Sequence, residues 1–320
     1  MAAGLSQHDS IRIVRGNRGS LALEIPKPRW MWYNVPVTAL PPRRGLLTSV
    51  GLDGDHRPAL VDFGNPLTPH CLVAGTTGSG KTNTQRVLIY DLAKQNPPDA
   101  VRFLLIDTRK RGSAWHQFAR LPHLAHSIVI EDGEALRSLA WAVAEIDRRA
   151  MSGQTQPRVF IGIDEAQALL DRDEFVRPIS DLAAVGREFG IHVLVALQNP
   201  TAAQLGDASI KRNLTARLVG RVDSAQAANV AAGVKGSGAE LLTGAGDMLM
   251  VLPAGVRRMT AALLTERDTD RLPCAEQVDS LDLDEYEDVD RVLEQAEGAA
   301  SKADPLDPAH VAWSLANPEA

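Results

Sequence analysis

Eight residues at positions 75–82, GTTGSGKT in one-letter code, have the composition and spacing of a phosphate-binding loop. Glycines let the backbone bend so that several N–H groups face one anion, and a helix that begins here adds its positive end. The amine of Lys81 is expected to contact the β- and γ-phosphates of ATP, and the hydroxyl of Thr82 is expected to bind Mg²⁺. The predicted ATP-binding residues are Gly75, Thr76, Thr77, Gly78, Ser79, Gly80, Lys81, Thr82 and Asn83.

Two carboxylates further along the chain are predicted to complete this chemistry. The apolar run at 158–163 indicates a buried strand that ends in Asp164 and Glu165. Parallel strands deliver such residues to one crevice, beyond their carboxyl ends. We expect Asp164 to hold the magnesium ion through water and Glu165 to polarise the water that attacks the γ-phosphate.

Polar and basic residues near the later strands are further candidates. Gln198 closes the apolar run 191–197, where it is expected either to sense the γ-phosphate by hydrogen bonding or simply to cap the strand. Arg187 and Arg217 are alternative candidates for an arginine finger that reaches the ATP of a neighbouring subunit, although either alone is typical of a surface or ion-pair arginine. The basic run 109–111 is interpreted as solvated surface. The predicted catalytic residues are therefore Glu165 and Lys81, with Gln198 and one of Arg187 and Arg217 as further candidates.

The pattern of apolar runs predicts the elements that position these residues. Short β-branched runs at 71–74, 101–106, 127–130, 158–163 and 191–197 indicate strands buried on both faces. Helical patterns lie between them at about 80–95 and 133–149, and runs at 247–252 and 256–263 indicate a hairpin. Alternating strands and helices predict an α/β fold, a mostly parallel sheet flanked by helices, preceded by a small β-rich N-terminal segment.

Composition and charge predict where the protein is located in the cell and where its domains begin and end. The 320 residues contain only two cysteines and no run near eighteen apolar residues, so a cytoplasmic protein without a membrane segment is expected. Residues 266–320 hold 16 acidic and 4 basic side chains, whereas residues 1–265 hold 24 acidic and 30 basic ones. A basic body is compatible with a polyanion partner. We expect an entry segment at 1–69, an ATPase domain at 70–265, and an acidic, flexible tail at 266–320.

The order of motifs over about 50–265 resembles the motor domain of the FtsK/SpoIIIE family of double-stranded DNA translocases, within the FtsK–HerA group of RecA-like P-loop ATPases. The similar segments are LVAGTTGSGKT, VRFLLIDTRK, LPHL, ALRSLAWAVAEIDRR, FIGIDEAQALL, GREFGIHVLVALQNP and GAGDMLMVLP. The resemblance implies a RecA-like fold, a ring of six subunits around DNA, and Arg187 as the finger that acts in trans.

The chain also departs from the family pattern. The family's Thr-Gln-Arg-Pro run stands here as Leu197-Gln198-Asn199-Pro200, and a family lysine falls on Ala225. A membrane-spanning N-terminus and a C-terminal winged-helix module that reads DNA orientation are not found in these residues.

The sequence is compatible with three alternative functions. The first is an ATP-driven motor that translocates double-stranded DNA in plasmid, conjugation or phage transfer or in segregation. The second is a secretion-type ATPase that acts on protein and docks a recruiting protein through the acidic tail. The third is an ATP-dependent switch or adaptor, which retention of Lys81 and Glu165 disfavours.

Overall fold

A mixed β-sheet forms the centre of the molecule. The computed structural model describes residues 12–15, 21–24, 34–198, 200–201, 208–276, 289 and 292–294. The ten-stranded sheet has the order β5-β4-β12-β11-β10-β6-β9-β8-β7, with β3 (Val35–Pro36) beside β12. Strands β1 (Arg12–Arg15) and β2 (Leu21–Glu24) form a separate antiparallel pair.

The half of the sheet that carries the predicted motifs is parallel. Its strands are β10 (Ala216–Val219), β6 (Cys71–Ala74), β9 (Ile191–Leu197), β8 (Arg158–Ile163) and β7 (Val101–Ile106). Because parallel strands end on the same side, the segments that follow β6, β8 and β9 meet at one edge. The predicted phosphate-binding loop and the predicted carboxylates are thereby brought together.

The other half of the sheet is antiparallel. It comprises β11 (Asp247–Leu252), β12 (Gly255–Leu263), β4 (Leu47–Asp53) and β5 (Pro58–Asp62). The predicted hairpin is thus present, and β4 and β5 extend the same sheet rather than forming a sheet of their own.

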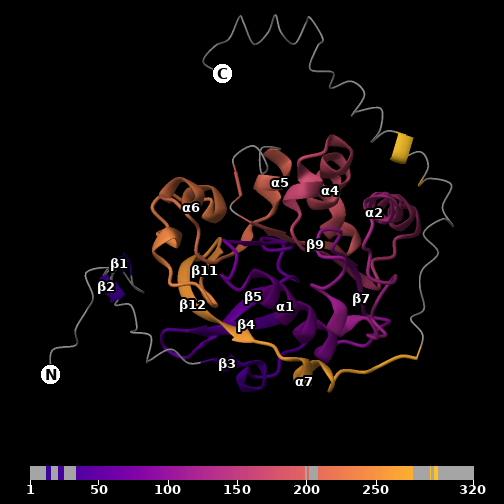
Figure 1. Cartoon of the computed structure of the whole chain (residues 1–320). Helices are drawn as coiled ribbons and strands as arrows, with labels where there is room; N and C mark the ends of the chain where they lie inside the picture. Colours follow the sequence, from indigo (N-terminus) through magenta and orange to yellow (C-terminus); the bar gives the residue numbers. More distant parts are fainter. Residues whose placement is uncertain are drawn as a thin grey trace, which may run out of the picture.

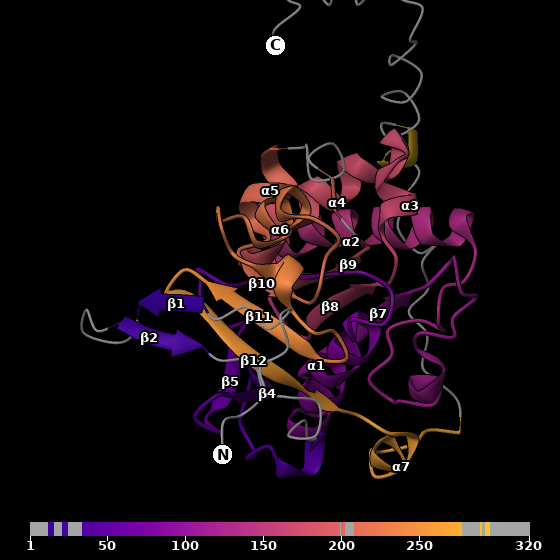
Figure 2. The same cartoon turned by 60° about the vertical axis from the view of Figure 1, so that its left-hand side comes forward.

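Helices cover both faces of the sheet (Figures 1 and 2). Helix α1 (Lys81–Gln95) packs on one face, where its residues share a core with Val73, Leu105 and Ala196. The other face is covered chiefly by α2 (Asp132–Ser152), α4 (Asp173–Val185) and α6 (Ala225–Ala232), which share a core with Leu72, Ile106 and Val195. The shorter helices are α3 (Gln167–Leu170), α5 (Ala208–Asn213) and α7 (Glu266–Thr269). The α/β fold with flanking helices is confirmed.

One predicted strand is wrong. The run 127–130 contacts the edge strand β7 only through an isolated bridge between Ile106 and Val129, and a second bridge joins Phe103 to Leu124. The two partners on β7 are three residues apart, whereas those on the other segment are five apart. The segment therefore has more residues than a continuous ladder accommodates, and it bows away from the sheet.

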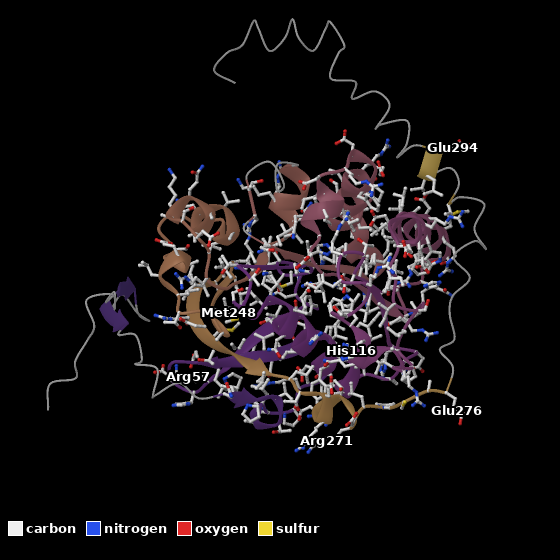
Figure 3. All side chains as sticks on the ribbon, viewed as in Figure 1. Arg57, His116, Met248, Arg271, Glu276 and Glu294 are labelled. Atoms are coloured by element: carbon white, nitrogen blue, oxygen red, sulfur yellow. The ribbon has the colours of Figure 1, made fainter. Side chains whose placement is uncertain are left out.

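The C-terminal segment follows the surface of this body. Ala275 and Arg120 exchange two hydrogen bonds, and His116 lies 3.2 Å from Glu266. Further along the chain, Val289 is buried in the helical core, and Glu276 and Glu294 lie on the same side of the molecule (Figure 3). Most of the predicted flexible tail lies outside the described residues.

No helix among the described residues is both long and apolar enough to cross a bilayer.

Candidate nucleotide-binding site

The loop between β6 and α1 bends in a way that only glycine permits easily. Gly75, Gly78 and Gly80 have φ angles of 145°, 78° and 102°. A Cβ on Gly75 would lie 2.6 Å from the hydroxyl of Ser79, and one on Gly80 would lie 3.1 Å from the backbone nitrogen of Gly246. The loop therefore closes on itself and packs against a neighbouring turn directly before the start of α1.

The polar side chains of this loop fit a phosphate ligand. The Lys81 amine donates to the carbonyl of Thr76 at 2.9 Å, and its burial lowers its pKa, an effect that the nearby Asp164 partly opposes. The hydroxyl of Ser79 is buried and has no hydrogen-bond partner among the described residues. A buried hydroxyl beside a glycine-rich turn and an amine is a donor set that a phosphate oxygen would satisfy.

Thr82 and Asp164 form a pair of oxygen ligands. The Thr82 hydroxyl donates to Asp164, with its oxygen 3.2 Å from Oδ1 and 3.4 Å from Oδ2. Asp164 stands directly after β8, and its N–H bonds to Ile106 of the neighbouring strand. A hydroxyl and one carboxylate, completed by phosphate oxygens and water, is a set that suits Mg²⁺. These two residues would hold the metal ion.

Glu165 adopts a strained backbone conformation. Its φ angle is 46°, in the left-handed region that residues with a Cβ seldom enter. The next residue is fixed, because the N–H of Ala166 donates to the carbonyl of Ala196 on β9. The turn directs the carboxylate of Glu165 out of the core, beside Asp164.

Lys110 contacts both carboxylates. Its amine lies 3.0 Å from Oδ2 of Asp164 and 2.8 Å from Oε1 of Glu165. Partial burial alone would lower the pKa of Lys110, but the hydrogen bond to Glu165 and the charge of Asp164 outweigh it, and the pKa is raised. The interpretation of 109–111 as solvated surface is therefore wrong for Lys110.

Gln198 contacts the phosphate-binding loop. Its side-chain amide donates to the hydroxyl of Thr77 at 2.7 Å, and its backbone N–H donates to the side chain of Gln167 at 3.1 Å. The residue is thus placed at the loop rather than capping β9 alone. Its role as a sensor stays a prediction.

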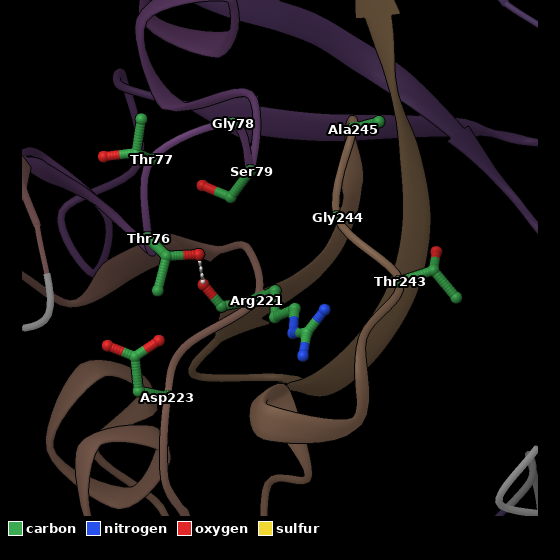
Figure 4. A pocket seen from close by; sticks show the side chains of 9 residues that line it. All are labelled: Thr76, Thr77, Gly78, Ser79, Arg221, Asp223, Thr243, Gly244 and Ala245. Carbon is green, nitrogen blue, oxygen red and sulfur yellow. Dashed lines mark hydrogen bonds between the residues drawn. The ribbon is translucent and has the colours of Figure 1, made fainter. Parts of the chain in front are cut away.

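A pocket of about 600 Å³ is lined on one side by the same loop (Figure 4). It lies between residues 76–79, Arg221, Asp223 and the turn 243–245. The carbonyl of Arg221 accepts hydrogen bonds from the backbone and the hydroxyl of Thr76, at 2.7 and 3.1 Å. This pocket gives a bound nucleotide room beyond its phosphates and one cationic side chain to contact.

The two candidate fingers occupy different environments. Arg187 is exposed in the short helix η5 (Gly186–Phe189), which precedes β9, whereas the phosphate-binding loop follows the end of its neighbour β6. A seven-residue strand is about 23 Å long, so Arg187 does not reach the loop of its own chain. Arg217 is buried, and its guanidinium donates to the carbonyls of Lys211, Leu214, Val230 and Ala231. Arg217 is a structural residue.

The side chain of Asn83 connects helix α1 to the sheet. Its side chain donates to the carbonyl of Ala262 at 2.6 Å and accepts from the N–H of Leu264 at 3.0 Å. The side chain therefore joins α1 to the end of β12 and is already occupied by these two bonds.

Comparison with known proteins agrees with this geometry. Residues 43–154 match the model of the FtsK/SpoIIIE family. The chain is 30% identical over 251 residues to the DNA translocase FtsK of Helicobacter pylori strain J99, and 28% identical over 256 residues to the DNA translocase SftA of Bacillus subtilis. The chain therefore contains a region of the FtsK/SpoIIIE type at residues 43–154. These matches cover 71% of the chain but only 29% and 26% of the two relatives.

Solved structures agree with the FtsK/SpoIIIE-type fold. The pCW3 conjugation coupling protein TcpA, solved with ATPγS, has a TM-score of 0.63 at 21% identity and covers 81% of this chain and 79% of its own. The Type VII secretion ATPase EccC of Thermomonospora curvata has a TM-score of 0.61 at 22% identity, over 83% of this chain and 34% of its own. The resemblance expected from the sequence is confirmed, and so is the P-loop ATPase fold.

Sequence reasoning missed Lys110 and Arg221. Lys110 follows β7, which neighbours β8, and Arg221 follows β10, which neighbours β6. In the sequence, each is a basic residue that closely follows an apolar run. Which loop its side chain reaches depends on the order of the strands in the sheet, which the sequence does not show. Ala225, where the resemblance placed a family lysine, is the first residue of α6.

Proposed function

We propose that this domain hydrolyses ATP with Mg²⁺. The observation that carries the proposal is the contact of Thr82 with Asp164, 3.2 Å apart, at the start of a helix that begins with a glycine-rich loop. A bound Mg²⁺ would neutralise negative charge on the β- and γ-phosphates. Lys81 and the loop N–H groups would bind the phosphates, and Glu165 would orient and accept a proton from the attacking water.

The work coupled to hydrolysis is proposed to be movement along double-stranded DNA. The relatives of highest sequence similarity described above are DNA translocases, and residues 1–265 carry an excess of basic side chains. The likeness to a secretion ATPase is one of fold, at 22% identity, and favours protein as the substrate less. Transfer of plasmid, conjugative or phage DNA, or DNA segregation, in the cytoplasm, is the proposed setting.

A ring of subunits, six by resemblance, is proposed as the working assembly. The nucleotide site and exposed Arg187 lie at opposite ends of the parallel strands of one chain. In a ring, these two ends of adjacent subunits would face each other, so Arg187 would complete the neighbour's site. Docking of a recruiting protein on the acidic tail is a further part of this proposal.

Steady-state ATPase measurements with linear duplex DNA test the proposal. We expect the rate to rise several-fold with DNA, and the stimulation to fall steeply with salt, because phosphate contacts release counterions. Scrambled sequences of one length should stimulate equally, since backbone contacts carry no sequence information. ATP hydrolysis that DNA of any length leaves unchanged would favour a protein substrate or a switch.

A further inference from the structure

Lys110 is the cation that the structure places against both acidic residues of the site. Its amine touches Asp164 at 3.0 Å and Glu165 at 2.8 Å. The Asp164 side chain is fully buried and the Glu165 side chain is 24% exposed, while Lys110 is 40% exposed. Asp164 also accepts the hydroxyl of Thr82, so two donors share the one carboxylate that would bind the metal ion.

The loop that presents Lys110 is built to hold its backbone in place. Buried Asp107 accepts the N–H of Lys110 at 2.8 Å and the N–H of Ala114 at 3.0 Å. Trp115, also buried, donates from its indole to the carbonyl of Ile106 at 3.1 Å. These hydrogen bonds fix the backbone from which the Lys110 side chain extends. A basic run that only faces solvent would not require a fixed backbone.

Helix α1 ties this loop to the nucleotide site. Arg86, one turn after Lys81 and Thr82, donates to the carbonyls of Ser113 and Ala114. The same helix therefore carries the metal-binding hydroxyl at its start and clamps the Lys110 loop a turn later. The lysine has a defined position relative to both carboxylates.

We propose that Lys110 is a positioning residue that competes with the divalent metal ion for Asp164 and orients Glu165. This inference rests on the proposed ATPase function. A carboxylate oxygen that accepts an ammonium group is a weaker ligand for a cation, and an ammonium beside a divalent ion is repelled by it. Binding of the metal ion therefore weakens the contact of Lys110 with Asp164. The contact with Oε1 of Glu165 remains and leaves Oε2 for the water.

Binding of Mn²⁺, followed by electron paramagnetic resonance with a non-hydrolysable ATP analogue, tests the competition. Lys110→Met should lower the dissociation constant of Mn²⁺ about fivefold, which corresponds to about 1 kcal/mol. The kcat for ATP should fall at least about tenfold, because Glu165 loses its orientation. Tighter metal binding combined with slower turnover is a result that simple damage to the fold would not produce.

Two matched variants complete the experiment. Lys110→Arg retains the charge and should return the dissociation constant of Mn²⁺ to within about twofold of the wild type. Arg109→Met, one residue away, removes a side chain that pairs with Asp132 at 3.5 Å, and both values should stay at wild type. Unchanged or weaker Mn²⁺ binding in Lys110→Met overturns the inference. A wild-type protein that binds no Mn²⁺ with nucleotide would instead overturn the proposed function.

Discussion

Individual residues at the site divide the work of binding and chemistry between them. Lys81 contacts the carbonyl of Thr76 within the loop, and Thr82 contacts Asp164. Glu165 follows Asp164 on a strained turn and shares the contact with Lys110. Replacing one residue should therefore remove one function and leave the others. This separation makes the site testable one side chain at a time.

Lys81→Ala and Glu165→Gln should fail in different ways. Without its amine, Lys81→Ala should bind ATP weakly, because the charge on the phosphates is not offset. Glu165→Gln has the same shape, so it should bind ATP normally and lose at least about a hundredfold in rate. Fluorescent-nucleotide binding and phosphate release measure the two effects. Wild-type hydrolysis by both variants would refute the site.

Arg187→Ala and Arg217→Ala should also have different effects, the first on the rate of ATP hydrolysis and the second on stability. Arg187→Ala should keep its stability and nucleotide affinity yet lose about a thousandfold in rate. Mixed with Lys81→Ala chains it should regain activity, because some interfaces then pair an intact loop with an intact finger. Arg217→Ala leaves four carbonyls without their donor and should lose about 3 kcal/mol of stability. Normal turnover by Arg187→Ala would contradict a role in trans.

At the scale of elements, the sequence predicts the bounds of individual strands better than it predicts which strands are neighbours in the sheet. The strands at 71–74, 101–106, 158–163, 191–197 and 247–252 have the predicted bounds, because each is a short, largely apolar run ended by a glycine, a proline or a polar residue. Which strands are neighbours is decided by long-range packing. The contact of Lys110 with Asp164 depends on β7 lying beside β8, so no local pattern reveals it.

The entry to β6 and β9 contains two buried histidines that should make the fold sensitive to acid. His192 stacks on Phe160 with ring centroids 4.6 Å apart, and His70 accepts the N–H of Val193. Burial lowers the pKa of His70 to about 3 and that of His192 to about 4. The folded protein therefore keeps both rings neutral at pH values where the unfolded chain protonates them.

Unfolding in urea at several pH values measures this effect. Above about pH 6.5 these histidines add no pH dependence, and as the pH falls toward 4 each should lower the free energy of unfolding by up to about 1.4 kcal/mol per pH unit. His192→Phe keeps the stack and should show a shallower slope. The exposed His56→Gln should match the wild type. Parallel slopes for His192→Phe and the wild type would contradict this account.

At the scale of the whole molecule, the C-terminal segment spans both layers. Residues 266–276 lie on the loop after β7, and Val289 is buried in the core on the opposite face of the sheet. The segment 266–320 also carries 16 acidic side chains. It is therefore expected both to add stability and to compete with DNA for basic side chains.

Removing residues 277–320 should separate these effects. The loss of Val289 burial should cost about 2 kcal/mol of stability, while ATP hydrolysis persists, because the described site lies within residues 75–245. DNA binding at low salt should tighten, since a competing polyanion is removed. Thermal unfolding and fluorescence anisotropy of labelled duplex DNA measure both quantities. Unfolding of the truncated protein at 25 °C would show that the segment is an integral part of the fold.

The left-handed backbone at Glu165 lowers the stability of the fold at a residue that is proposed to act in catalysis. A residue with a Cβ costs about 1 kcal/mol there, whereas glycine adopts the same angle freely. Glu165→Gly should therefore raise the melting temperature and, if Glu165 activates the water as proposed, abolish ATP hydrolysis.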